Sequence, residues 1–283
     1  MAEAREVQGR VGQDRVDGLR ADVADYRTLA AAWGRAAMSY RASFVMLSLG
    51  GLVITALDFV AIAVLLSRAT TLGGFGLREI ALLYGASGLG IAVADLAVGQ
   101  VERLGRHIRS GRLDTMLVRP TSLLVQVCTE EFSPRRISRV VQAAVVFGWG
   151  CGAVAWTPER VLLAGQMLVS ATLLFGALFV GLACLQFWTT DGQQVANAFT
   201  YGGNTVTQYP LVIFPREVVL ALTFAVPLAF VSWYPSLRLL DRPDPLGLPA
   251  ALAWCSPVAV VLAVLATVLV WRAGVRRYTS TGS

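Results

Sequence analysis

The sequence predicts an all-α integral membrane protein, and three observations lead to this prediction. The chain of 283 residues is 55% hydrophobic and only 15% charged, with a mean hydropathy of +0.61, whereas a soluble domain carries about a quarter charged residues. Apolar stretches nearly free of charge recur along the chain, and about 20 such residues cross the hydrocarbon core of a bilayer. Their continuous length excludes the alternating strands of an outer-membrane barrel. Composition therefore also excludes a soluble enzyme and a nucleic-acid-binding protein.

Six of the apolar stretches are expected to span the membrane, and they lie at 43–66, 77–98, 140–156, 161–187, 192–213 and 251–271. All 24 basic residues are arginine, and 18 of them fall on one face if the N-terminus is inside. Because cytoplasmic loops carry the positive excess, both termini are expected in the cytoplasm. The expected organisation is a cytoplasmic N-terminal tail with an interfacial helix (1–42), a six-span domain (43–271) and a cytoplasmic C-terminal tail (272–283).

A seventh apolar stretch, at 217–233, contains Pro227 and is flanked by further prolines. Proline removes a backbone donor and breaks a helix, and a seventh span would place the arginines of the C-terminal tail outside. We therefore predict a re-entrant hairpin at 214–239 on the outer face, before the last span. Such broken backbone survives at membrane depth only where protein or a water-filled cavity covers it.

Residues 22–41 are predicted to form an amphipathic helix that lies in the membrane interface. Aromatic and apolar residues recur on one face at spacings of three and four, whereas arginines project elsewhere. The residues of this face are Tyr26, Leu29, Trp33, Ala37 and Tyr40.

Small residues recur every four positions within the second and third spans. Small side chains let helix backbones approach closely in lipid. We interpret these positions as sites of helix packing: Ala86, Gly90, Ala94, Gly148 and Gly152.

No motif for catalysis, for a metal or for a nucleotide is found in the sequence. Ser87 lies in a Gly-Ala-Ser-Gly string typical of intramembrane serine proteases, which need a nearby base. The single histidine, His107, is expected to be a solvated residue of the inner loop, far from Ser87. We therefore expect no catalytic residue, metal ligand or cofactor in this chain.

The inner loop at 99–139 is long for a compact membrane protein, and long loops are commonly functional. Its arginine-rich segment at 101–124 turns at Ser110–Gly111 and stops at Pro120. Such a segment suits docking of a cytoplasmic partner, or attraction to lipid headgroups. Composition leaves both alternatives open.

The fifth span is unusually polar for a helix in lipid, where each unsatisfied polar group costs several kcal/mol. Its polar residues form one stripe at spacings of three and four: Gln193, Asn197, Tyr201, Asn204 and Gln208. We predict that the stripe faces a partner subunit and lines a transport path. Asp58 in the first span is the other polar outlier, with a functional and a structural interpretation both open.

Several strings of the sequence resemble one family of type-2 ATP-binding-cassette (ABC) exporter permeases. These strings are Arg109-Ser-Gly-Arg-Leu-Asp-Thr-Met-Leu-Val-Arg-Pro120, Asn197-Ala-Phe-Thr-Tyr-Gly-Gly203, Tyr209-Pro-Leu211, Pro227-Leu-Ala-Phe230 with Tyr234-Pro235, Asp244-Pro-Leu-Gly-Leu-Pro249 and Arg277-Tyr-Thr-Ser-Thr-Gly-Ser283. They occur in the family's order, and the resemblance covers the chain from about residue 26 to the end.

The resemblance implies six spans, an interfacial N-terminal helix, a coupling helix between spans two and three, and a re-entrant hairpin before span six. It also implies a second permease subunit, identical or similar, and two copies of a cytoplasmic ABC ATPase that holds ATP and Mg. The coupling residues would be Arg109, Arg112, Leu113, Asp114, Met116, Val118 and Arg119. We expect Leu113, Met116 and Val118 to enter a groove on the ATPase and the arginines to meet its acidic rim.

The expected function is export of an amphipathic small molecule or lipid-like substrate across the bacterial inner (plasma) membrane, driven by the partner ATPase. The alternative is an ion- or proton-coupled secondary transporter. That class requires charged groups within the spans and paired broken helices. Asp58 and Asp95 are the only candidates for such groups, and no repeat relates the two halves of the chain.

Overall fold

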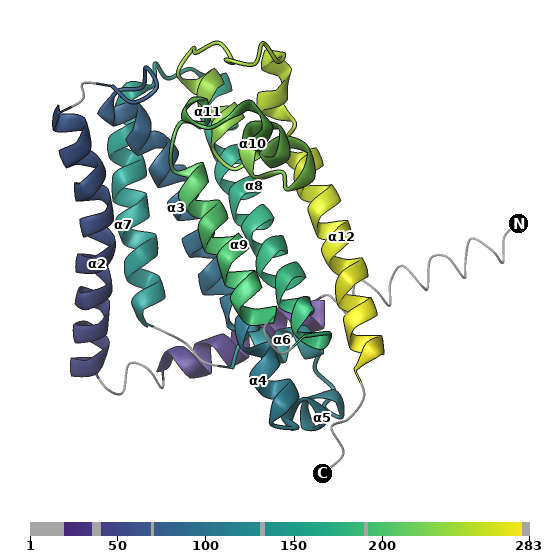
Figure 1. Ribbon diagram of the computed structural model, residues 1–283. Coiled ribbons are helices and arrows are strands. Elements are labelled where there is room, and N and C mark those ends of the chain that lie inside the picture. The colour runs from purple at the N-terminus through teal and green to yellow at the C-terminus, as the bar shows by residue number, and fades with distance from the viewer. Residues whose placement is uncertain (1–19, 36–40, 69–70, 131–133, 190–191, 279–283) are drawn as a thin grey trace, which may run out of the picture.

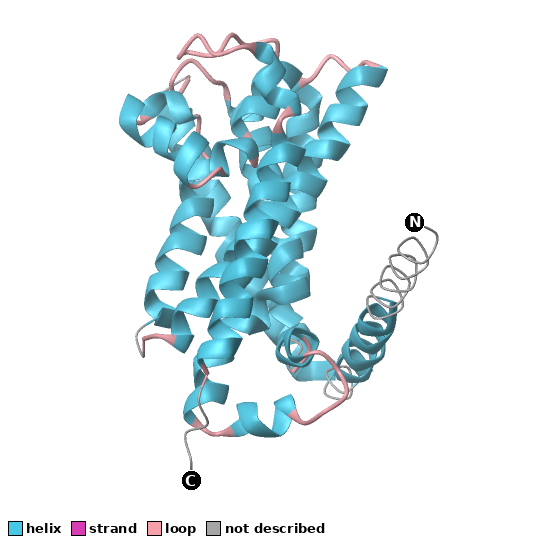
Figure 2. Ribbon diagram, turned by 90° about the vertical axis from the view of Figure 1, so that its right-hand side faces the viewer, coloured by secondary structure: helices cyan, strands magenta, loops and turns pink. Residues whose placement is uncertain are grey.

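A computed structural model describes residues 20–35, 41–68, 71–130, 134–189 and 192–278, and within these ranges the regular elements are helices. Six longer helices run alternately between the two ends of a bundle (Figure 1). They are α2 (Arg41–Arg68), α3 (Leu77–Val98), α7 (Pro134–Gly150), α8 (Pro158–Ala183), α9 (Gly192–Thr207) and α12 (Ser256–Arg277). Figure 2 shows the loops gathered at the two ends.

Four helices among the described residues are long and apolar enough to cross a membrane: Val45–Val64, Leu77–Arg109, Pro158–Phe187 and Ser256–Arg277. A bent pair, Arg216–Ala225 and Leu228–Leu239, would make a fifth span if it counts as one. α7 and α9 have 17 and 16 residues, roughly 24–26 Å at 1.5 Å per residue, against about 30 Å of hydrocarbon. The chain is therefore an all-helical protein with four or five candidate spans, and six spans stay a prediction.

Five helices differ in their bounds from the predicted spans: α2 and α8 by two to four residues at each end, and α7, α9 and α12 by up to six. α7 begins and ends six residues before the predicted 140–156, and the next helix starts at Pro158 with Thr157 as its N-cap. α9 ends before the predicted 213, since Pro210 lies just beyond it. α12 begins at Ser256 rather than 251, with proline in its first turn, and continues through the arginines to Arg277. Hydropathy alone places such arginines in a loop after the span rather than in the helix.

α3 lies at the centre and packs mostly against α7 and α8. A Cβ atom at Gly85 would lie 2.4 Å from the backbone nitrogen of Phe147, and one at Gly150 would lie 2.4 Å from that of Leu82. The backbones of α3 and α7 therefore touch. A Cβ at Gly148, by contrast, would meet no heavy atom within 4 Å. The glycine of α7 in this contact is therefore Gly150 and not the predicted Gly148.

The second-span part of the packing prediction agrees with the structure. Ala86 and Ala94 are buried, and a Cβ at Gly90 would lie 2.6 Å from the Cβ of Ala171 on α8. Gly152, in the third span, would meet only the end of the Arg78 side chain, at 3.8 Å.

The lower end of the bundle in Figure 1 carries the segment between α3 and α7, the helix at 20–35 and the end of α12. The segment folds as η1 (Gly99–Arg103), α4 (Leu104–Arg109), α5 (Arg112–Leu117) and α6 (Leu123–Cys128). Tyr26 joins the helix at 20–35 to α3, since its hydroxyl donates to the carbonyl of Ala97 at 2.8 Å. Burial raises the pKa of Tyr26, which keeps the donor protonated.

The described part of the N-terminal helix, residues 20–35, overlaps the predicted amphipathic stretch. On the predicted apolar face, Tyr26 and Leu29 are half-buried and Trp33 is exposed. Ala37 and Tyr40 lie outside the described residues. The position of this helix relative to a membrane stays a prediction.

The upper end carries the bent pair, which comprises α10 (Arg216–Leu220), a π-helical turn at Ala221–Ala225, a short turn at Leu228–Phe230 and α11 (Trp233–Leu239). The two arms meet at 85° around Pro227, where a proline inside a helical run breaks the hydrogen-bond ladder. Ion pairs join this end to α3 and α8: Arg242 with Glu79 (2.9 Å), Arg238 with Glu159 (3.0 Å), and Arg160 with Asp241.

Candidate functional site

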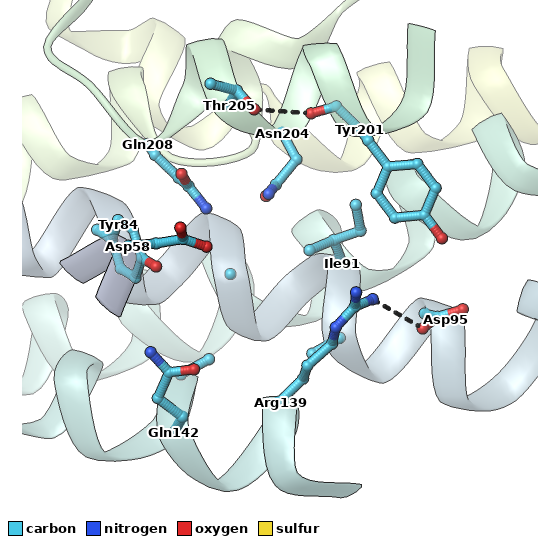
Figure 3. A pocket seen from close by; sticks show the side chains of 13 residues that line it. Asp58, Tyr84, Ile91, Asp95, Arg139, Gln142, Tyr201, Asn204, Thr205 and Gln208 are labelled. Carbon is cyan, nitrogen blue, oxygen red and sulfur yellow. Dashed lines mark hydrogen bonds and ion pairs between the residues drawn. The ribbon is translucent and has the colours of Figure 1, made fainter. Parts of the chain in front are cut away.

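A polar cavity of about 200 Å³ lies between α2, α3, α7 and α9 (Figure 3). Apolar side chains from α3 and α7 complete its wall. The polar residues that line it are Asp58, Tyr84, Asp95, Arg139, Gln142, Tyr201, Asn204, Thr205 and Gln208. A cavity of this character inside an apolar bundle is the default candidate for a binding site.

The polar face of α9 forms one wall of the cavity and is held by α3. The Ser87 hydroxyl donates to Oδ1 of Asn204 at 2.9 Å and shares a hydrogen bond of 2.6 Å with the Thr207 hydroxyl. Ser87 is fully buried, and its hydroxyl positions α9 against α3.

Three members of the predicted polar stripe, Tyr201, Asn204 and Gln208, line the cavity. Gln193 and Asn197 are not among the lining residues. Oδ1 of Asn197 is buried and has no hydrogen-bond partner among the described residues. Helical spacing therefore grouped three residues that line one cavity. The predicted stripe is longer than the cavity, so its first two residues lie outside the lining.

A charge cluster closes the lower part of the cavity. The carboxylate of Asp95, which is 3% exposed, pairs with Arg136 at 3.2 Å and with Arg139 at 3.5 Å. The Tyr201 hydroxyl donates to Oε2 of Glu102 at 3.5 Å. Sequence reasoning missed the two arginines because it placed them in the inner loop; the earlier start of α7 brings them into the bundle.

Asp58 reaches the cavity from α2, and Figure 3 shows its carboxylate beside Tyr84 and Gln208. Among the described residues it has no hydrogen-bond or ion-pair partner. The Tyr84 ring packs against Phe59 of α2 at a centroid distance of 5.3 Å, which links α2 to α3.

The segment between α3 and α7 presents a different surface from the predicted one. Leu113 is fully buried and Met116 is 5% exposed, whereas Leu117 and Val118 are 44% and 85% exposed. The Met116 carbonyl accepts a hydrogen bond from Nε2 of Gln126 at 2.9 Å. Leu113 and Met116 therefore pack inside the chain, contrary to our expectation that they enter a partner's groove, and Val118 remains as an apolar anchor.

Charged residues hold this segment together. Glu130 pairs with Arg112 at 2.6 Å and with His107 at 2.5 Å. His107 is 5% exposed, so it is a buried structural residue and not the solvated loop residue we expected. Asp114 accepts a hydrogen bond from the Tyr278 hydroxyl at 3.0 Å, which ties the end of α12 to α5.

The turn between α4 and α5 depends on Gly111, whose φ of +69° suits glycine. Arg109 and Arg119 are exposed on this surface. Cys128, at the end of α6, is a buried free thiol, and burial raises its pKa to about 12, so it is a neutral packing residue.

Comparison with known proteins adds one finding. A family model described as ABC-2 family transporter protein matches residues 52–282. No curated protein and no solved structure matches the chain.

Proposed function

Because the chain belongs to the ABC-2 transporter family and is a multi-pass permease subunit of an ABC transporter, we propose that it exports an amphipathic small molecule or lipid-like substrate. Family membership implies partnership with an ABC ATPase. The observation that carries the proposal is the polar cavity inside an apolar helix bundle. Polar groups facing hydrocarbon would cost several kcal/mol each, so the cavity is proposed to face water and substrate.

The cavity is proposed to lie on the export path, next to a second permease subunit that is identical or similar. α2 packs mainly against α7, and its side of the cavity is open, since Asp58 is an exposed residue. α9 also exposes Phe199 and Thr205. A facing subunit would cover these two helices and enclose the cavity between the two copies.

The energy is proposed to come from two copies of the cytoplasmic ATPase, which hold ATP and Mg. Docking is assigned to the surface around α5, with Leu117 and Val118 as apolar contacts and Arg109, Arg112 and Arg119 around them. Apolar anchors surrounded by charge are typical of protein interfaces. Leu113, Asp114 and Met116 are proposed to hold this surface in shape.

The proposed topology has six spans, cytoplasmic termini and an outer hairpin in a bacterial inner membrane. Two observations support it: the arginine-rich inner segment and the end of α12 lie at one end of the bundle, and the bent pair lies at the other (Figure 1). α7 and α9 are short and partly polar for spans, and we propose that the surrounding protein and water, rather than lipid, contact their polar groups.

Reconstitution tests the function directly. The permease, purified with its ATPase and placed in proteoliposomes, is expected to move an amphiphile only with ATP and Mg. Transport by the permease alone, driven by a proton gradient, would instead indicate a secondary transporter.

Alanine at Tyr201 or Asn204 is expected to lower substrate-stimulated ATPase activity by about threefold to tenfold, the effect of losing one hydrogen bond of about 0.5–1.5 kcal/mol. Gln194→Ala is the matched control, because Gln194 lies on the same helix but does not line the cavity. If all three variants have the substrate-stimulated ATPase activity of wild type, α9 does not line the export path.

A cysteine at Arg216 in a cysteine-free background is expected to react with an impermeant maleimide from outside intact cells. Arg216 begins α10 and is exposed. A cysteine at Arg109, at the other end of the bundle, is the control and is expected to react only after the membrane is opened. The reverse labelling pattern would refute the proposed orientation.

A further inference from the structure

The charges that line the cavity are not equally compensated. Asp95 holds both Arg136 and Arg139, at 3.2 and 3.5 Å. Asp58, in contrast, has no ion-pair or hydrogen-bond partner within the described part of the chain. A lone carboxylate at membrane depth is costly and marks a functional site by default.

The neighbours of Asp58 suit a cation. Figure 3 shows the carboxylate at the end of the cavity away from Arg139, next to the phenol ring of Tyr84 and the amide of Gln208. An aromatic face attracts an organic cation, and an amide oxygen accepts hydrogen bonds from an ammonium group. Arg139 at the other end repels a second positive charge.

The size of the cavity limits what can occupy it. About 200 Å³ is less than the roughly 300–1,000 Å³ of sites that enclose drug-sized ligands. The volume accommodates a headgroup and not a whole amphiphile. α2 packs mainly against α7, so an acyl or alkyl chain can leave along the open side of α2.

We infer that this cavity binds the cationic headgroup of an amphiphile, with Asp58 as its counter-ion. The inference rests on the proposed function, because it assigns a substrate class to the proposed export path. Asp58 neutralises an ammonium group, Tyr84 covers it with an aromatic face, and the polar face of α9 hydrates or hydrogen-bonds the remainder. An anionic headgroup is disfavoured, because it would lie against the uncompensated carboxylate.

Binding is measured on the complete permease–ATPase complex in nanodiscs without nucleotide, with empty nanodiscs subtracted. The probes are hexylammonium, hexyl sulfate and hexyl glucoside, which share one chain and differ in charge. Wild type is expected to bind the cation saturably and more tightly than the other two. Asp58→Asn is expected to weaken cation binding by about tenfold or more, because the attraction between the headgroup and the carboxylate is lost, and to leave the other probes unchanged.

Two further variants control the experiment. Asp58→Glu keeps the charge and is expected to retain most of the affinity for the cation. Glu217→Gln removes a charge from the exposed α10 and is expected to change nothing. The inference is overturned if Asp58→Asn binds the cation as tightly as wild type, whether or not that variant also loses permease–permease association. It is also overturned if wild type shows no preference for the cation.

The outcomes separate this inference from the proposed function. A complex that binds the cation through Asp58 but moves no amphiphile with ATP would support the site and refute export. A complex that exports amphiphiles with ATP, but handles the cationic one equally well with Asp58→Asn, would support export and overturn the cationic headgroup site.

Discussion

Replacing Val118 with aspartate is expected to lower ATP-driven transport by about tenfold or more, the loss typical of a central interface residue. Val118 is 85% exposed at the end of α5, so the change leaves the fold intact and places a charge in the proposed ATPase contact. The measurement is ATP-dependent transport, with co-purification of the ATPase as a second readout. Val118→Ile, which keeps an apolar surface, is expected to transport normally.

Leu113→Asp is expected to act through folding instead. Leu113 is fully buried, and an unpaired charge there would cost several kcal/mol, so little folded permease should reach the membrane. Size-exclusion profiles of the two variants distinguish the effects. A well-folded Leu113→Asp that transports normally, or a Val118→Asp that keeps both transport and ATPase binding, would contradict the assigned surface.

Gly150→Ala is expected to destabilise the permease by roughly 1–3 kcal/mol, the usual cost of overpacking a well-packed core. The new methyl group would lie 2.4 Å from the backbone nitrogen of Leu82, and backbone atoms cannot move aside as the end of a side chain can. Gly85→Ala is expected to behave in the same way, since its methyl group meets the backbone of Phe147. Thermal denaturation of the purified complex measures the change.

Gly148→Ala is the matched control on the same helix. It introduces the same methyl group where no atom lies within 4 Å, and alanine is the better helix former. Its stability is expected to equal or exceed that of wild type. Equal stability of the Gly148 and Gly150 variants would mean that α3 and α7 do not touch through their backbones.

The coarse architecture was accessible to sequence reasoning because its signals are local. The second span was predicted at 77–98 and α3 has the same bounds. The break at 214–239 was predicted from Pro227, and the two arms there meet at 85°. An apolar run and a proline act within their own few residues, so neither requires knowledge of the neighbouring helices.

The candidate site was only partly accessible. Asp58 and the upper polar residues of α9 were identified, because polar groups are conspicuous in apolar spans. The partners of Asp95 were missed: Arg136 and Arg139 lie 41 and 44 residues away in the chain. The positive-inside rule assigns arginines near the end of a span to a cytoplasmic loop. Here they neutralise a buried carboxylate instead.

The burial of α5 required the tertiary structure as well. A helix of six residues shows less than two turns of periodicity, so its sequence does not identify the inward face. Packing against the rest of the chain covers Leu113 and Met116 and leaves Val118 exposed. In the same way, a spacing of four residues marked Gly148 as a packing glycine, but the rotation of α7 turns Gly150 toward α3.

The sequence by itself thus determined that the chain is a helical membrane protein, that it resembles ABC exporter permeases, and where most helices lie. These conclusions depend on composition, hydrophobic length and short strings of residues, which are properties of single segments. Only the tertiary structure decided which side chains share the polar cavity, which charges cancel and which face of α5 remains exposed. Those properties depend on the rotation and depth of each helix relative to its neighbours, which packing over the whole bundle sets.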